Sequence, residues 1–190
     1  MTLISDIAKI RVGLHTSASE TGHIAYLQAR NFDGLGRLST HIDTYINTET
    51  DHKVERHMLQ AGDVLLASKG FRIFGWAYNI EVGPAIASSM FFILQPDVQK
   101  VLPEYLATFF NSQPAQAHFQ ALSAGSSIPS IRKSEIEGFS IPLPPISIQQ
   151  RVVELKKAHE HGMDLSEKLT HEKQRLFDAV TYKLIYQQHD

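Results

Sequence analysis

The sequence predicts an α+β fold, in which a globular, β-rich body at residues 1–146 is followed by one long, coiled-coil-like helix at residues 147–190. Residues 23–95 hold short runs of β-branched and aromatic residues between Gly, Asn and Asp turns, which is typical of strands. Pro-Leu-Pro-Pro at 142–145 then interrupts regular structure, because proline fixes its own φ and lacks the N–H of a ladder. Beyond the prolines, apolar residues recur every three or four positions, as in an amphipathic helix.

The N-terminal half is expected to alternate strands with polar turns. Residues 6–10 fit a short helix capped by Ser5 or Asp6, whereas Ile10 to Val12 fits a strand, and the sequence leaves both open. Asn31 to Gly36 is predicted as a turn, because Asn, Asp and Gly tolerate positive φ. The other expected elements are strands at 23–28, 73–82 and 85–95, a turn and buried strand at 59–70, partial alternation at 38–46, and a loop with some helix at 47–57.

Helical spacing begins after Leu102, where Pro103 suits a first helical position and Pro114 suits the start of a second helix. A loop at 124–131 then leads to a short helix or turn at 132–136 and a strand-like segment that ends at the prolines. Ser147 and Gln150 have the spacing of a capping box, which predicts the start of the terminal helix.

The terminal helix is expected to run from about residue 148 to about residue 186. At the standard rise it would extend about 60 Å, whereas a body of this size has a radius of gyration of about 15 Å. Its apolar stripe must therefore be buried against something outside its own domain. Two interpretations stay open: a hairpin folded back at Gly162, or a long partner-binding arm. The expected interface residues are Val152, Leu155, Leu169, Leu176 and Val180.

Composition excludes several classes of protein. The 190-residue chain has no cysteine, so disulfides and thiolate metal sites are excluded. It has no apolar run long enough to cross a bilayer and no secretory signal pattern, so no membrane partner is expected and the expected location is cytoplasmic. A net charge of −2 argues against a protein that grips DNA alone by bulk electrostatics, although a local basic face remains compatible.

No catalytic constellation emerges from the motifs. Phe32 to Gly36 matches the loose Phe-x-Gly-x-Gly pattern of S-adenosylmethionine loops, but the Asn/Asp-Pro-Pro-aromatic partner motif is missing and a hairpin turn is favoured. Asp63 and Lys69 lack the further acidic residue of a nuclease set, and Ser126 and Ser127 lack the context of a nucleophile elbow. The ten histidines show no metal-ligand spacing. The sequence therefore predicts a non-enzymatic binding module without cofactor or metal.

Basic residues in or beside Gly- and Ser-rich turns are the candidates for DNA contact, because short polar loops can reach phosphates and base edges. Ser68 to Arg72 combines backbone access, two charges and an aromatic ring. Ordinary solvated loop charge remains the alternative interpretation. The candidate DNA-binding residues are Arg30, Arg37, Lys69, Arg72, Arg132 and Lys133.

Five sequence segments form a pattern through their order along the chain. They are Leu-Ile-x-Asp-Ile-Ala-Lys-Ile-x-x-Gly at 3–13, Gly-Asp-Val-Leu-Leu-Ala-Ser-Lys-Gly at 62–70, Pro-Glu-Tyr-Leu at 103–106, Gly-Ser-Ser-Ile-Pro-Ser-Ile from 125, and the Ile-Pro-Leu-Pro-Pro junction followed by Gln150. In this order they resemble the DNA-specificity subunits of type I restriction-modification systems. The resemblance implies that the body is a target recognition domain that reads half of a bipartite DNA site. It also implies that the helix is a conserved arm and that partners supply the chemistry.

The resemblance implies partners as well: double-stranded DNA, a DNA adenine methyltransferase subunit, and a restriction or motor subunit. The family typically carries two recognition domains and two conserved helices, whereas this chain has one of each and is expected to act as a half-subunit. Two copies that pair their helices as a homodimer, or one copy with a second half-subunit, would restore the usual geometry. The alternative function is an orphan or decoy interaction module that does not read DNA. Base-reading residues do not follow from the resemblance.

Overall fold

The computed structural model of this chain describes residues 1–34, 36–39, 41–46, 52–70, 72–122 and 129–186. The chain divides into two compact units, Met1–Gln150 and Arg151–Asp190. The first unit contains the strands β1 (Thr2–Leu3), β2 (Ala8–Val12), β3 (Ile24–Leu27), β4 (Tyr45–Ile46), β5 (Val64–Ala67), β6 (Gly75–Ala77), β7 (Ala85–Ala87), β8 (Phe91–Pro96) and β9 (Ser140–Ile141). Its helices are η1 (Ile4–Asp6), η2 (Ala29–Asn31), α1 (His52–His57), η3 (Ile80–Val82), α2 (Pro103–Phe110), α3 (Gln113–Leu122) and α4 (Lys133–Glu137).

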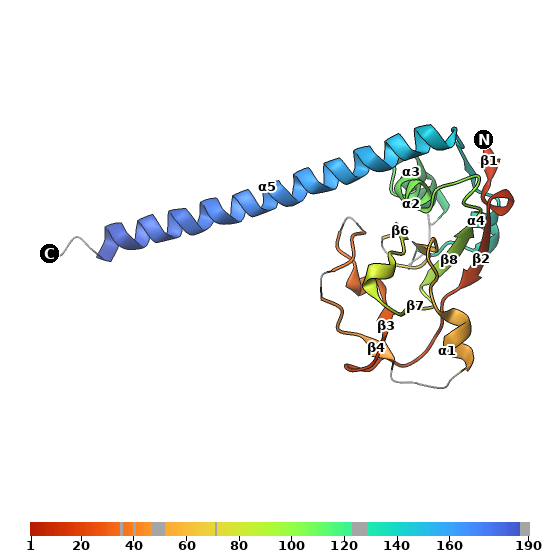
Figure 1. Cartoon of the computed structure of the whole chain (residues 1–190), viewed down its shortest axis with the longest axis horizontal. Coiled ribbons are helices and arrows are strands. Elements are labelled where there is room, and N and C mark those ends of the chain that lie inside the picture. The colour runs from red at the N-terminus through yellow and green to blue at the C-terminus, as the bar shows by residue number, and fades with distance from the viewer. Residues whose placement is uncertain (35, 40, 47–51, 71, 123–128, 187–190) are drawn as a thin grey trace. The chain divides into compact units, whose positions relative to one another are not determined.

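In the part of the body that the structure describes, the strands form three small sheets (Figure 1). The largest is antiparallel, with the order β2-β8-β5-β6, and its inner strand β5 is fully buried. The second has the order β4-β3-β7, with β3 antiparallel to β4 and parallel to β7. The third pairs β1 with β9, so the two ends of the body are joined. The α+β class is confirmed.

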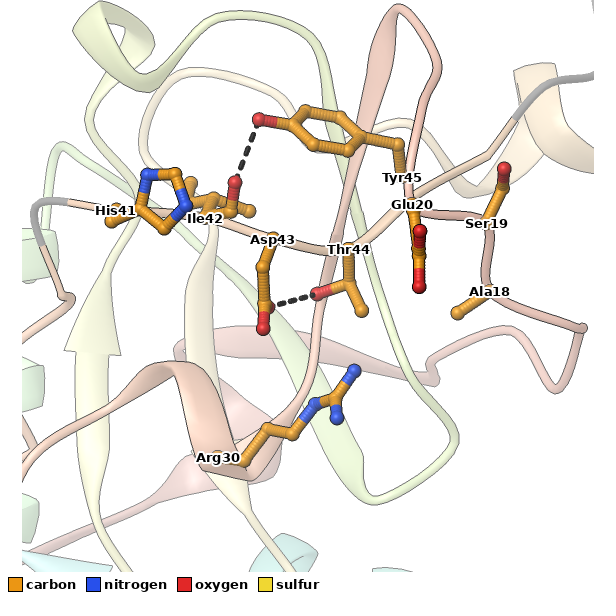
Figure 2. Close-up of a pocket in the computed structure, with 9 residues that line it drawn as sticks. All are labelled: Ala18, Ser19, Glu20, Arg30, His41, Ile42, Asp43, Thr44 and Tyr45. Atoms are coloured by element: carbon orange, nitrogen blue, oxygen red, sulfur yellow. Dashed lines mark hydrogen bonds between the residues drawn. The ribbon is translucent and has the colours of Figure 1, made fainter.

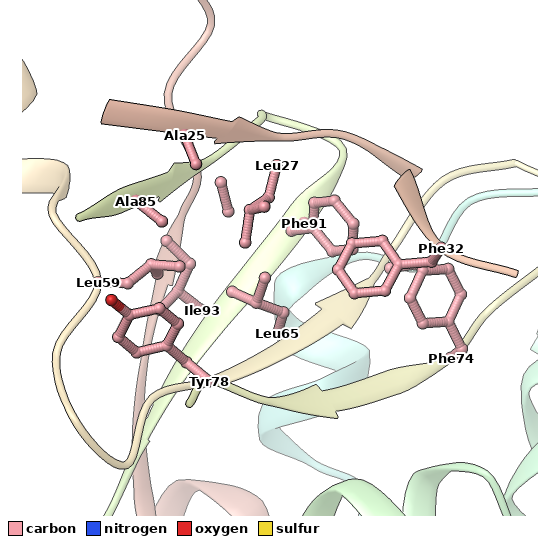
Figure 3. Packing of buried hydrophobic residues seen from close by; sticks show 12 residues of the cluster. Ala25, Leu27, Phe32, Leu59, Leu65, Phe74, Tyr78, Ala85, Phe91 and Ile93 are labelled. Carbon is pink, nitrogen blue, oxygen red and sulfur yellow. The ribbon is translucent and has the colours of Figure 1, made fainter. Parts of the chain in front are cut away.

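The core lies between the two larger sheets and is centred on a group of aromatic rings (Figure 3). The Phe32 ring centroid lies 5.0 Å from that of Phe74 and 5.7 Å from that of Phe91. Each such pair contributes about 0.5–1.5 kcal/mol beyond its buried area. Because Phe32 belongs to the turn after η2, this packing fixes the turn on the core.

Helix α2 packs against β5 and β6, and the absence of a side chain at Gly75 lets the helix lie close to the sheet. A Cβ at Gly75 would lie 2.9 Å from the Phe110 Cβ and 3.0 Å from the Ala107 carbonyl oxygen. The Asn111 side chain then pairs with the backbone of Gly75 in both directions: the Gly75 N–H donates to Oδ1 at 2.9 Å, and Nδ2 donates to the Gly75 carbonyl at 2.8 Å. An amide side chain thus continues the ladder at the edge of the sheet.

Most predicted elements are confirmed, and three details were wrong. The strand expected at 73–82 is only β6, Gly75–Ala77, and residues 80–82 form the 3-10 helix η3, in which the Asn79 side chain accepts the Glu81 N–H at 3.0 Å. Residues 8–12 are a strand, which settles the ambiguity at the N-terminus. The strand expected at 85–95 is two strands, β7 and β8, which belong to different sheets and are separated by a turn at Ser88, whose carbonyl accepts the Phe91 N–H at 3.0 Å. The sequence does not reveal this turn, because both strands are buried and the residues at 90–94 form an apolar run.

The terminal helix α5 is continuous from Ile146 to Tyr186, so the hairpin at Gly162 is excluded. Its 41 residues correspond to about 60 Å at the standard rise. The capping-box prediction was wrong: the helix begins at Ile146, so Ser147 lies inside the first turn, and the Pro145 carbonyl accepts the N–H groups of Ile148 and Gln149. Within the described residues, no helix has the length and apolar character needed to cross a membrane.

Gln149, rather than Gln150, fixes the first turn of α5. Its side chain is fully buried, and Oε1 accepts the Leu102 N–H at 2.8 Å. Its Nε2 donates to the carbonyls of Lys100 at 3.0 Å and Pro144 at 2.9 Å. One amide therefore satisfies three backbone groups at the start of α2 and at the proline junction.

We expect Gln149→Leu to lower the free energy of unfolding by about 2–4 kcal/mol, because three buried backbone groups lose their partner. Chemical denaturation of the full chain measures this value. Gln150→Leu is the matched control, since Gln150 is exposed, and it should change the stability by less than about 0.5 kcal/mol. Equal stability of the two variants would show that the buried amide is not an anchor.

Candidate functional site

The turn at Asp33–Arg37 brings together two of the predicted basic residues. The Arg37 Nε donates to the Asp33 carboxylate at 2.7 Å. The Arg72 guanidinium donates to the backbone carbonyls of Phe32 and Asp33 and lies 5.9 Å from the centre of the Phe74 ring. Both cations thus have intramolecular partners. Arg72 in particular holds the turn on the body, which is a structural role that its sequence context did not indicate.

A second group of cations forms where the end of β5 meets the segment before α4. Lys69 and Ser130 form an antiparallel bridge, with the Gly70 N–H donating to Pro129 at 2.9 Å and the Ile131 N–H donating to Ser68 at 2.8 Å. This pairing places Lys69 beside the segment that leads into Arg132 and Lys133.

The cations of this second group differ in their partners. Lys69, Arg132 and Lys133 are all exposed, but the Lys133 Nζ lies 3.4 Å from the Glu137 carboxylate. Lys69 and Arg132 are therefore the better candidates for phosphate contact, because no neighbouring carboxylate competes with a ligand for their charge among the described residues. Phe71, Ser126 and Ser127, which the sequence had singled out, lie outside the described residues.

Arg30 lies in a polar pocket of about 590 Å³ (Figure 2). Residues 18–20, 30 and 41–45 line it. Figure 2 shows the Arg30 side chain extending from η2 toward the segment that carries Asp43 and Thr44. The pocket walls also carry Glu20 and His41, so the lining includes both hydrogen-bond donors and acceptors.

A buried asparagine, Asn31, forms hydrogen bonds with residues that line the pocket. Asn31 is 3% exposed, and its Oδ1 accepts the Gln28 N–H at 2.8 Å and the Thr44 hydroxyl at 3.3 Å. Its Nδ2 donates to the Asp43 carboxylate at 3.3 Å. The Asp43 carboxylate is therefore oriented by a residue adjacent to Arg30 in the chain. The sequence did not single out Asn31 or Asp43, because Asn31 resembled an ordinary turn residue and Asp43 lay among the polar residues of a partly alternating segment.

Two tyrosines have a displaced pKa, and both are structural donors. Burial raises the pKa of Tyr78, and the nearby Asp63 carboxylate adds to the effect. Burial also raises the pKa of Tyr105. The Tyr78 hydroxyl donates to the Gly83 carbonyl at 2.7 Å, and the Tyr105 hydroxyl donates to the Pro142 carbonyl at 2.9 Å. Among the described residues, no cluster of three His, Asp or Glu side chains could hold a metal ion.

Helix α5 presents the predicted interface residues to solvent. Four of them are 49–72% exposed, namely Leu155, Leu169, Leu176 and Val180, and Val152 is half-buried. The sequence analysis missed further exposed apolar residues on this helix, which are Met163, Leu165, Phe177, Tyr182, Leu184, Ile185 and Tyr186. The three-and-four spacing of the stripe does not include them, because several lie beside it on the helix surface.

The chain resembles proteins of known class. A family model described as type I restriction modification DNA specificity domain matches residues 4–173. Among solved structures, a chain from work on complex assembly and conformational transition of the type I R-M system is similar, with a TM-score of 0.65 and 17% identity over 95% of this chain and 49% of that one. No curated protein matches the sequence.

Two further structures are similar at 15% identity and a TM-score of 0.62. The HsdS subunit from Thermoanaerobacter tengcongensis matches 96% of this chain and 43% of its own length. The type I restriction-modification system S subunit from M. genitalium matches 99% of this chain and 46% of its own length. At this identity the likeness shows a shared fold, and the chain spans about half the length of the solved chains that it matches.

Proposed function

Because this chain belongs to the family of type I restriction modification DNA specificity domains, we propose that it reads DNA sequence for a type I restriction-modification system. The family match over residues 4–173 carries the proposal, since it includes the body and most of α5. In this proposal the body is a target recognition domain that reads one half of a bipartite site. Partner subunits supply adenine methylation and restriction, and this chain is not itself catalytic.

Helix α5 is the proposed arm for self-association and for docking of the methyltransferase subunit. Its apolar stripe is exposed along the helix, and such a stripe is normally buried against a partner. Two copies paired antiparallel as a coiled coil would bring two recognition domains to one DNA molecule. Because the protein two-fold is then mirrored in the site, the proposed target is a gapped palindrome.

Lys69 and Arg132 are the proposed phosphate contacts, and Arg30 at the pocket is a further proposed DNA-binding residue with a different role. Lys133 and Arg37 are ion-paired and Arg72 holds a turn, so we expect smaller contributions from them. The net charge of −2 fits a subunit whose partners share the phosphate contacts.

Selection from random-sequence DNA tests this function directly. The full chain is co-purified with the methyltransferase subunit of its system, and bound DNA is recovered and sequenced. The proposal expects enrichment of one gapped site with inverted halves, and no enrichment by the methyltransferase subunit alone. Recovery of unenriched DNA by the intact complex would contradict it and would favour a module that does not read DNA.

A further inference from the structure

The polar pocket at residues 18–20, 30 and 41–45 has an unusual balance of charge for a surface that meets DNA. A phosphate site requires an excess of positive charge, but here Glu20 and Asp43 accompany Arg30. Among the described residues, neither Arg30 nor Asp43 takes part in an ion pair, so each retains hydrogen-bonding capacity for a ligand. The pocket therefore suits a neutral partner that presents acceptors and donors together.

One turn orients the Asp43 carboxylate and positions the backbone of Arg30. Arg30 and Asn31 are consecutive in η2, and buried Asn31 is fixed by the Gln28 N–H at 2.8 Å. Of the two Asp43 carboxylate oxygens, only Oδ1 accepts from the Asn31 amide, and it also lies 3.4 Å from the Thr44 hydroxyl oxygen. No hydrogen bond within the described residues uses Oδ2, the second oxygen of this carboxylate. An oriented acceptor and a nearby guanidinium are thus presented from a preorganised support.

A G·C base pair has the complementary pattern. In the major groove guanine offers the acceptors O6 and N7, which pair with arginine, and cytosine offers the N4 amino donor, which pairs with a carboxylate. Asp43 and Arg30 are both exposed, so the edge of a base pair can reach both side chains. An A·T pair cannot satisfy this arrangement equally, because adenine would present its N6 amino donor to the arginine and thymine its O4 acceptor to the carboxylate.

We propose that this pocket is a specificity-determining subsite that reads a G·C pair, with Arg30 donating to guanine and Asp43 accepting from cytosine. The proposal rests on the DNA-reading function proposed above and assigns one position of its target to two named side chains. Asn31 is a positioning residue, since it acts through Asp43.

The test is selection from random-sequence DNA with the assembled complex of the full chain and its methyltransferase subunit. The complexes compared carry the wild-type chain, Arg30→Gln or Asp43→Asn. For the wild type we expect a fixed G·C pair in each half-site. Each variant should reduce discrimination at that single pair by roughly 10- to 100-fold, while preference at the other positions is kept. Lys9→Gln, a charge removal in β2 outside the pocket, is the control and should leave every position unchanged.

The outcomes separate this subsite from the general function. A wild-type complex that enriches a gapped site, together with variants that retain full discrimination at every G·C pair, would overturn the subsite alone. A site without any G·C pair would do the same. Wild-type complexes that enrich no sequence would overturn both the subsite and the DNA-reading function.

Discussion

Replacing both Leu169 and Leu176 with aspartate is expected to raise the dissociation constant for self-association by at least about 100-fold. Both side chains lie on the exposed stripe of α5, with 56% and 66% of their surface open to solvent. In a paired helix they become buried, and a buried carboxylate without a partner costs several kcal/mol. In a homodimer each substitution occurs twice. Sedimentation velocity over a range of concentrations measures the change.

Lys157→Asp with His171→Asp is the matched control for this prediction. Both residues are exposed on α5, and their positions in the 3.6-residue period place them away from the stripe. The control pair should therefore associate like the wild type. If the leucine variant associates as tightly as the control, the stripe is not the interface. A wild type that stays monomeric at all concentrations would reject homodimerisation and favour a different second subunit.

Removing charge at Lys69 and Arg132 is expected to weaken DNA binding by roughly 30-fold at physiological salt. The pairing of Lys69 with Ser130 brings these exposed cations to one region of the body. If each contacts one phosphate, Lys69→Gln with Arg132→Gln removes two contacts. The slope of log affinity against log salt should then fall in magnitude by about two. Binding titrations at several salt concentrations measure both quantities.

This loss should be similar for all DNA sequences, because phosphates carry no sequence information. It differs in kind from the position-specific loss expected for Arg30 and Asp43. Lys9→Gln with Lys100→Gln removes the same charge and is the control. Lys9 pairs with Gln95 near one end of β8. At the other end of β8, Phe91 pairs with Ala67, which lies two residues before Lys69. The control charge in β2 is therefore distant from Lys69. An unchanged salt slope in the Lys69 and Arg132 variant would reject the phosphate assignment.

The elements with strong local signals were predictable from the sequence. Pro103 marks the first residue of α2, and the three-and-four spacing after the prolines predicts α5 nearly to its last residue. These signals are local, because proline geometry and helical periodicity act within a few residues. The division of 85–95 between two sheets was not predictable, since two buried strands and one continuous apolar strand have the same composition.

The candidate site was predictable only as a set of residue types. The sequence indicated that basic residues in turns matter, but it could not separate Arg72 from Arg30. Arg72 bonds to carbonyls at Phe32 and Asp33, nearly 40 positions away in the chain, whereas Arg30 has no ion-pair partner among the described residues. Gln149 was missed for the same reason, because its partners at Lys100 and Leu102 are distant in sequence. Long-range hydrogen bonds leave no periodic signal.

A methylome tests the central claim most directly. The chain is co-expressed with the methyltransferase subunit of its system in a host that lacks adenine methylation, and modified adenines are mapped by long-read sequencing. The account predicts a gapped palindromic motif that disappears when this chain is omitted. A gapped asymmetric motif would keep the DNA-reading role and replace the homodimer with two different half-subunits. Absence of any new motif, with both proteins soluble and associated, would contradict the claim that this chain reads DNA.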